Sequence, residues 1–148
     1  MAIYFYSTRD PNYGCFSNFS RHGFELDDLW WPTSEHYFQA QKFVESDRPW
    51  FEKINQANTP SIAAKMGRDR GHPLRTDWEQ VKDDIMQQGV LKKFTTHAKI
   101  REILLATGDE LIVENAPKDY YWGCGADGSG KNQLGKILMV VREILRQQ

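Results

Sequence analysis

The sequence predicts an α+β protein that is predominantly α-helical and carries a small β-sheet. Most of its 148 residues fall into segments with apolar residues at helical spacing and recognisable start signals. Only three short stretches have the β-branched and aromatic character of strands: Ile3–Tyr6, Phe24–Trp31 and Leu111–Glu114. The chain contains no repeat, low-complexity tract or linker, so we expect one compact domain over residues 1–148.

Three helices are expected in the first half of the chain, each marked by a proline near its start. The first begins at Pro32, with Thr33 or Ser34 as its cap, and runs to about Val44. The second is short and opens within the segment 47–50. The third starts at 59–60, and Gly67 is expected to end it by adopting a left-handed conformation.

Three further helices are expected in the second half. Thr76 and Glu79 have the spacing of a capping box, and apolar residues recur at helical intervals after them. The segment around Thr95–His97 is expected to divide this stretch into two helices, of which the second ends at Gly108. A glycine-rich loop over residues 123–130 then leads into an amphipathic C-terminal helix.

Composition narrows the class of function. The net charge of −1 argues against a broad basic surface for nucleic acid, since that mode of binding needs many phosphate contacts. No apolar run approaches the roughly 18 residues of a membrane span, and no signal peptide is visible, so we expect a cytoplasmic protein without membrane contact. The two cysteines, Cys15 and Cys124, are too few for a disulfide framework or a structural zinc site.

The segment Trp31–Phe43 carries the strongest functional signal. Glu35, Gln39 and Lys42 follow one another at i, i+4 and i+7, so they share one helix face, with Phe38 beside them. An acid, an amide and a lysine next to an aromatic ring form a plausible wall for a polar ligand. The alternative is a solvated helix face with a salt bridge.

The glycine-rich loop matches two nucleotide-binding sequence patterns, but the strands that normally accompany those patterns are not predicted here. Residues 123–128 fit G-x-G-x-x-G and residues 125–132 nearly fit a P-loop, but the strands that either fold requires do not follow. Successive backbone N–H groups ahead of a helix can still bind an anion, and Lys131 would add a charge there. The alternative is that the glycines serve only to make tight turns.

Taken together, the motifs resemble the NADAR superfamily, or YbiA-like proteins. The resemblance runs in order from residue 14 to residue 142 and therefore covers nearly the whole chain. It rests on Gly14-x-Phe-Ser-Asn-Phe19, Trp31-x-Thr-x-Glu-His-Tyr-Phe-Gln-Ala-x-Lys-Phe43, Gly67-Arg68, Arg75-x-Asp-Trp78, Lys93-Phe94, Asp119-x-x-Trp-Gly-x-Gly125, Gly128-x-Gly-x-Asn-x-Leu-Gly135 and Leu138-Met-x-x-Arg142.

The resemblance implies a compact YbiA-like domain and an N-glycosidase that works without a cofactor. Its implied substrates are ribosylaminopyrimidine phosphates of early riboflavin biosynthesis, or ADP-ribose joined to the amino group of guanine. Both classes have an exocyclic amine on C1 of a ribose that carries phosphate at its 5-position. The implied partner is thus a small phosphoribosyl or ADP-ribosyl molecule, with ADP-ribosylated DNA or RNA also open. The sequence leaves the oligomeric state undetermined.

Two chemical routes are open for cleaving such a bond. In one, Glu35 or Asp119 activates water while a general acid protonates the leaving amine. In the other, which we favour, a neutral Lys42 displaces the amine by forming a Schiff base with the opened sugar. Glu35 would then move protons, although a close carboxylate also tends to keep the lysine charged.

The remaining candidates are substrate-binding residues. Guanidinium and ammonium groups suit phosphate, aromatic rings suit the base or ribose, and side-chain amides suit their polar edges. These residues are Asn18, Trp31, Phe38, Gln39, Arg68, Trp122, Gly123, Gly125, Lys131 and Asn132. Core packing is the alternative for each aromatic, and helix capping for Asn132. His36 is expected to be structural, and no spacing suggests a metal site. A non-catalytic module that binds ADP-ribose or NAD is the alternative function.

Overall fold

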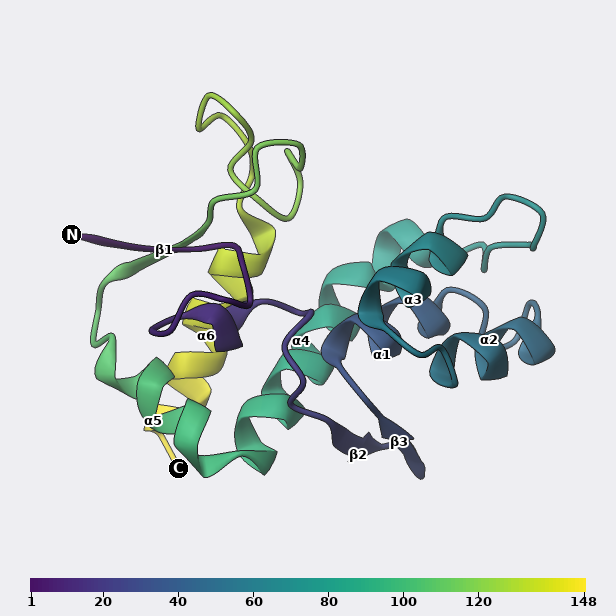
Figure 1. The fold of residues 1–148 in the computed structure, drawn as a ribbon, viewed down its shortest axis with the longest axis horizontal. Helices are drawn as coiled ribbons and strands as arrows, with labels where there is room; N and C mark the ends of the chain where they lie inside the picture. Colours follow the sequence, from purple (N-terminus) through teal and green to yellow (C-terminus); the bar gives the residue numbers. More distant parts are fainter. The chain divides into compact units, whose positions relative to one another are not determined.

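The computed structural model describes residues 1–148, which form two compact units. Unit 1 comprises residues 1–20 and 94–148, and unit 2 comprises residues 21–93. Figure 1 shows that helices dominate, with two separate two-stranded sheets. The predicted α+β, mainly helical class is confirmed. The expectation of a single domain over residues 1–148 stays a prediction.

Unit 1 is built around a parallel pair of strands and a long helix. Strand β1 (Ala2–Phe5) pairs in parallel with β4 (Leu111–Glu114), so the N-terminal segment joins a strand from the last third of the chain in one sheet. Helix α6 (Gln133–Arg146) packs against β4 and against α5 (Ala98–Ala106). A short 3₁₀ helix, Gly14–Phe16, adds an aromatic ring to this core.

A buried arginine fastens the connection between α5 and β4. Arg142 Nη1 donates to Thr107 Oγ1 and to the Glu110 carbonyl, each at 2.9 Å. Its side chain is buried on the inner face of α6, so these two acceptors replace the water it has lost.

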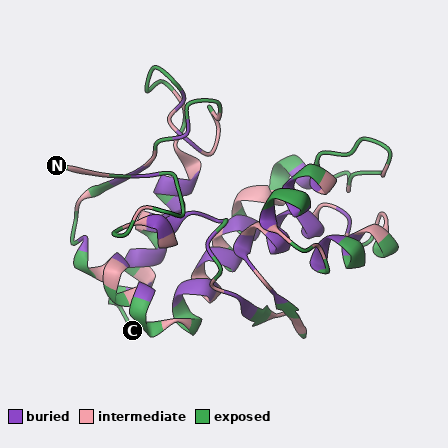
Figure 2. Ribbon diagram, in the orientation of Figure 1, coloured by how far each residue is buried: buried purple, intermediate pink, exposed green.

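Unit 2 is a helical cluster around α1 (Ser34–Gln41). Helices α2 (Arg48–Asn55) and α3 (Pro60–Gly67) pack on α1, and most of α4 (Trp78–Thr96) belongs to the same unit. Seven of the eight residues of α1 are buried, which Figure 2 shows as an almost continuous purple helix. The alternative of a solvated helix is therefore wrong.

Local signals explain where the helices of unit 2 begin. The Thr33 hydroxyl accepts from the His36 backbone N–H at 3.1 Å, and Asp47 and Thr59 cap α2 and α3 in the same way. The His36 ring contacts Thr33 Oγ1 at 2.7 Å and the Ala57 carbonyl at 2.9 Å. Burial lowers the pKa of His36, so the ring is a neutral structural group, as expected.

Three predictions about local structure are wrong. Residues 24–31 form a hairpin rather than one strand: β2 (Phe24–Leu26) pairs antiparallel with β3 (Leu29–Trp31). Asp27 and Asp28 supply its two-residue turn with φ of 55° and 64°. Gly67 is not left-handed but ends α3 as a helical residue. Helix α4 begins at Trp78, one residue later than the capping box predicts.

The other predicted elements are confirmed within about three residues, the largest difference being that α1 ends at Gln41 instead of near Val44. The break between α4 and α5 falls at His97, and Gly108 is left-handed with φ of 63° just after α5. None of the helices combines the length and the apolar character that crossing a bilayer requires.

Candidate functional site

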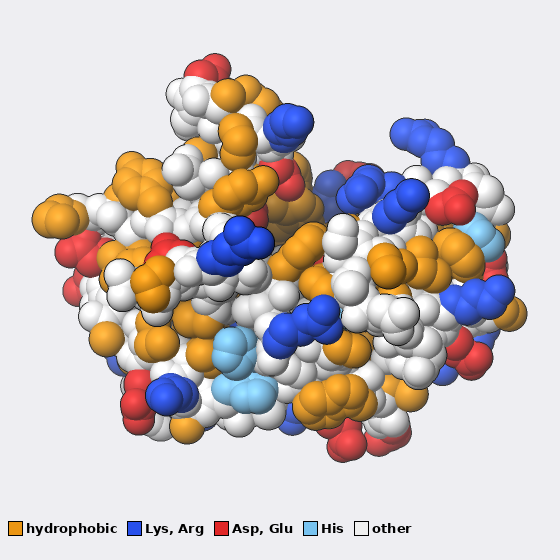
Figure 3. Space-filling model, viewed as in Figure 1, with side chains coloured by type: hydrophobic (Ala, Val, Ile, Leu, Met, Phe, Trp, Pro, Cys, Tyr) orange, Lys and Arg blue, Asp and Glu red, His pale blue; other side chains and the backbone are white.

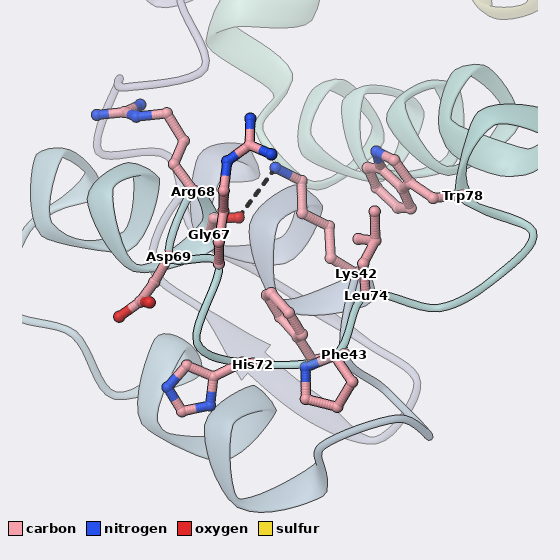
Figure 4. Close-up of a pocket in the computed structure, with 10 residues that line it drawn as sticks. Lys42, Phe43, Gly67, Arg68, Asp69, His72, Leu74 and Trp78 are labelled. Atoms are coloured by element: carbon pink, nitrogen blue, oxygen red, sulfur yellow. Dashed lines mark hydrogen bonds between the residues drawn. The ribbon is translucent and has the colours of Figure 1, made fainter.

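Lys42 lies on the wall of a cavity of about 540 Å³ in unit 2. It directly follows α1, and its amine donates to the Gly67 carbonyl at 3.3 Å (Figure 4). The aromatic rings of Phe38 and Trp78 flank the amine, with their centroids 5.8 and 5.7 Å away. Lys42, the last residue of the helix face predicted from the sequence, therefore borders a pocket instead of open solvent.

The surroundings of Lys42 favour its neutral form. Burial lowers the pKa of its amine most strongly, and the positive charges of Arg68 and Lys82 lower it further. Glu35 acts in the opposite direction, but the net effect on the pKa is downward. A larger fraction of Lys42 is thus uncharged at a given pH than of an ordinary surface lysine.

Glu35 and Gln39 form a fixed pair one turn apart on α1. Gln39 Nε2 donates to Glu35 Oε2 at 2.7 Å, while Gln39 Oε1 is buried without a hydrogen-bond partner. A Cβ on Gly67 would collide with the Gln39 amide. The glycine of the Gly67-Arg68 motif therefore lets α3 approach α1, and its carbonyl then reaches Lys42.

The loop after α3 forms the other wall of the pocket and is rich in positive charge. It contributes Arg68, Arg70, His72 and Leu74, together with Asp69. Figure 3 shows several basic side chains close together on this part of the surface. Arg68 was predicted, whereas Arg70 and His72 were missed. Two arginines and a histidine within five residues of a turn-rich segment were the available signal.

Trp31 lies in the core rather than at the pocket. Its side chain is fully buried, and its indole N–H donates to the Leu26 carbonyl at 3.0 Å. Its ring meets those of Tyr37 and Phe51 edge-on, at centroid distances of 5.4 and 5.5 Å. The core-packing alternative therefore accounts for Trp31.

Other predicted residues belong to unit 1, and several have structural roles there. Asp119 Oδ1 accepts from the backbone N–H groups of Tyr121 and Trp122 at 3.0 and 2.8 Å, which fixes a turn. The Trp122 ring packs edge-on against Tyr121. Asn18 is buried after the 3₁₀ helix.

The glycine-rich loop uses its backbone donors internally. The N–H groups of Gly125, Gly128 and Gly130 donate to the carbonyls of Ala116, Gly125 and Cys124, respectively. The tight-turn alternative therefore describes these glycines, and Gly125 and Gly128 need their positive φ of 73° and 81°. Gly123 is buried, and its carbonyl accepts from the Asn132 N–H at 3.0 Å.

Two polar residues at the end of the loop also have internal partners. Asn132 stands before α6 but makes no side-chain capping bond. Its amide instead accepts from Glu114 N and donates to the Ile112 carbonyl, both at 2.9 Å, so it ties the loop to β4. Lys131 is exposed, with its amine 5.4 Å from the centre of the Tyr121 ring.

The structure thus brings Glu35, Phe38, Gln39, Lys42 and Arg68 together in unit 2. The arrangement places a partly buried amine and unpaired arginine side chains on one cavity, with the Glu35 carboxylate electrostatically coupled to the amine. It suits nucleophilic or acid–base chemistry on an anionic ligand. No group of three or more His, Cys, Asp or Glu side chains is placed to hold a metal ion.

The protein has an α+β fold with a cavity lined by Lys42, and comparisons with known proteins give its family. Residues 4–146 match the NADAR domain, so the chain belongs to the NADAR family. It is 58% identical to the N-glycosidase Npun_R5314 of Nostoc punctiforme over 147 residues, covering 99% of this chain and 94% of that protein.

Two further relatives connect the chain to a solved structure and to a biosynthetic protein. It is 50% identical to the N-glycosidase YbiA of Escherichia coli, covering 97% of this chain and 88% of that protein. The NMR structure of E. coli YbiA superposes with a TM-score of 0.91, covering 99% of this chain and 86% of that one. The chain is also 43% identical to the chloroplastic riboflavin biosynthesis protein PYRR of Zea mays, of which it spans only 25%.

Proposed function

We propose that the protein is a hydrolase that cleaves the N-glycosyl bond between ribose C1 and an exocyclic amine of a nucleobase-like group. Its family and the names of its relatives support this reaction class. The observation that carries the mechanism is Lys42: an amine with a lowered pKa, flanked by two aromatic rings, on the wall of a basic cavity.

The favoured route passes through a lysine Schiff base. The nitrogen lone pair of the substrate opens the ribose to an imine at C1, and the neutral Lys42 amine adds to that carbon. A proton moves to the substrate nitrogen, the C1–N bond breaks, and the amine leaves with the sugar held as an imine on Lys42. Water then adds to C1, the sugar is released as an aldehyde, and the lysine amine is regenerated.

Glu35 is the proton carrier in this route. Its carboxylate is electrostatically coupled to Lys42 and held by the Gln39 amide at 2.7 Å. It accepts the proton that the amine loses on addition and returns it to the leaving nitrogen. Direct attack of a water activated by Glu35 is the second route, and it requires no covalent intermediate.

For the substrate, we propose a small phosphoribosyl molecule of the ribosylaminopyrimidine type. Similarity to riboflavin biosynthesis proteins supports this choice. Guanine that carries ADP-ribose on its amino group has the same reacting bond, free or in nucleic acid, and is the competing substrate.

The test is release of the free base from each of these two substrates. We expect Lys42→Ala and Glu35→Gln to reduce turnover by about 10²-fold or more, the scale of a positioned nucleophile or proton carrier. Lys65→Ala, which removes an exposed lysine of α3, is the matched control and should keep full turnover. Near-normal turnover by Lys42→Ala would refute the Schiff-base route, and no release from either substrate would refute the proposed function.

A further inference from the structure

His72 lines the same cavity as Lys42 but is held by a different set of contacts. Its Nδ1 lies 2.7 Å from Asp47 Oδ2, and its ring stacks on Trp50 with centroids 3.7 Å apart and planes inclined by 6°. Phe43 meets the ring edge-on at 6.4 Å. Figure 4 shows the His72 ring and the Lys42 amine on opposite sides of the Phe43 ring.

The contact with Asp47 determines which ring nitrogen is available. An ionised carboxylate only accepts hydrogen bonds, so Nδ1 must carry the proton that it donates. Asp47 is itself fixed, since its Oδ1 accepts from the Trp50 N–H at 3.2 Å and caps α2. Nε2 of His72 has no hydrogen-bond partner within the protein.

The hydrogen bond between His72 and Asp47 also acts on the carboxyl group. It lowers the pKa of Asp47, with smaller contributions from the Trp50 N–H and from Lys53, so the carboxylate stays ionised and keeps accepting from Nδ1. Nε2 is therefore the ring nitrogen that remains for a ligand.

Two arginines of the same loop have unused donors as well. The side chains of Arg68 and Arg70 are exposed, line the cavity, and form no hydrogen bond or ion pair within the protein. By contrast, Arg75 pairs with Asp77 at 2.6 Å. The one carboxylate on this wall, Asp69, accepts from the Gly71 N–H at 2.8 Å and stabilises the turn.

We propose that His72, held by Asp47 and stacked on Trp50, binds the 5-phosphate of the ribosyl substrate through Nε2, together with Arg70 and Arg68. This inference rests on the proposed function and adds a phosphate subsite to the same pocket. Guanidinium groups form strong charge-assisted hydrogen bonds with phosphate oxygens, and a single proton between Nε2 and a phosphate oxygen completes the contact at His72. With phosphate at His72, the sugar extends past Phe43 and C1 approaches Lys42.

The first test is calorimetric binding of ribose 5-phosphate to the full chain. We expect His72→Gln to weaken binding roughly 10- to 100-fold, the usual range for a hydrogen bond to a charged group. Arg70→Gln should also weaken it, and because that side chain is exposed and unpaired, the variant is expected to fold normally. His97→Gln is the matched control and should bind as the unmodified protein does. Unchanged affinity in both pocket variants, or no binding of ribose 5-phosphate to the unmodified protein, would overturn the proposal.

The second test separates phosphate binding from a structural role. We expect His72→Gln to lower kcat/KM for the phosphorylated ribosylaminopyrimidine and to leave the phosphate-free form almost unaffected. Equal losses on both substrates would show that His72 only stabilises the loop, and the proposal would fail. ADP-ribose as a second ligand distinguishes the source of the phosphate: tighter binding than ribose 5-phosphate indicates a diphosphate, and weaker binding a monophosphate.

The two proposals can fail separately. If neither substrate is cleaved but ribose 5-phosphate binds in a manner that depends on His72, the glycosidase proposal is refuted and the phosphate subsite stands. If the substrates are cleaved without any effect of the phosphate or of His72, the glycosidase proposal stands and the subsite is refuted.

Discussion

Gly67→Ala is expected to destabilise the protein and damage the site at once. The new Cβ would collide with the Gln39 amide, whose Nε2 is already held by Glu35, and would lie 2.9 Å from Gln39 Cβ. Overpacking costs roughly 1–3 kcal/mol, and a clash with both the held amide and Gln39 Cβ places this substitution in the upper part of that range, at about 2–3 kcal/mol. Alanine regains about 1 kcal/mol through its higher helix propensity. The net loss in the free energy of unfolding is therefore about 1–2 kcal/mol.

Thermal unfolding measures this loss, which corresponds to a decrease in Tm of roughly 2–8 °C. The cause is isolated by repeating the substitution in a Gln39→Ala background, where the amide is gone but its Cβ remains. We expect the cost of Gly67→Ala to fall there without vanishing. An unchanged Tm in the single variant, or an equal loss in both backgrounds, would refute the reasoning.

Three further substitutions probe the site and the core. Lys42→Met should abolish turnover. It should also raise the free energy of unfolding, measured by urea denaturation, by roughly 0.5–2 kcal/mol, because a desolvated amine is replaced by an apolar chain. Glu35→Gln removes the charge that raises the pKa of Lys42, so the rise of residual kcat/KM with pH should begin at a lower pH; a shift to higher pH would contradict the assignment. Arg142→Met leaves Thr107 and the Glu110 carbonyl without their donor and should cost about 1–3 kcal/mol by thermal unfolding, with turnover per folded molecule retained.

Local chemistry explains which elements the sequence predicts well. The caps Thr33, Asp47 and Thr59 each stand directly before a helix, and the prolines that follow two of them fit the first turn. The hairpin was missed because its turn is Asp27-Asp28, whereas the usual two-residue signals contain glycine. Gly67 was predicted to be left-handed because a glycine at a helix end usually adopts that conformation. Here the glycine is needed because a side chain would collide with Gln39.

From the sequence, the site could be predicted only for those residues that share one helix face. The spacing of Glu35, Gln39 and Lys42 gives their common face, but their burial depends on α2 and α3 packing around α1. His72 could not be found from spacing, because its partner Asp47 lies 25 residues earlier. Trp31 was assigned to the ligand because an aromatic residue in a motif does not reveal whether it packs inward.

Reductive trapping tests the central claim, that Lys42 forms a covalent bond with the sugar. The purified protein would be mixed with the ribosylaminopyrimidine phosphate and borohydride, and then digested for mass spectrometry. The account predicts that the peptide containing Lys42 carries one phosphoribosyl group, with two hydrogens added by reduction of the imine. It predicts no such adduct in Lys42→Ala. Rapid release of the base with no adduct on Lys42, or with an adduct on another lysine, would contradict it.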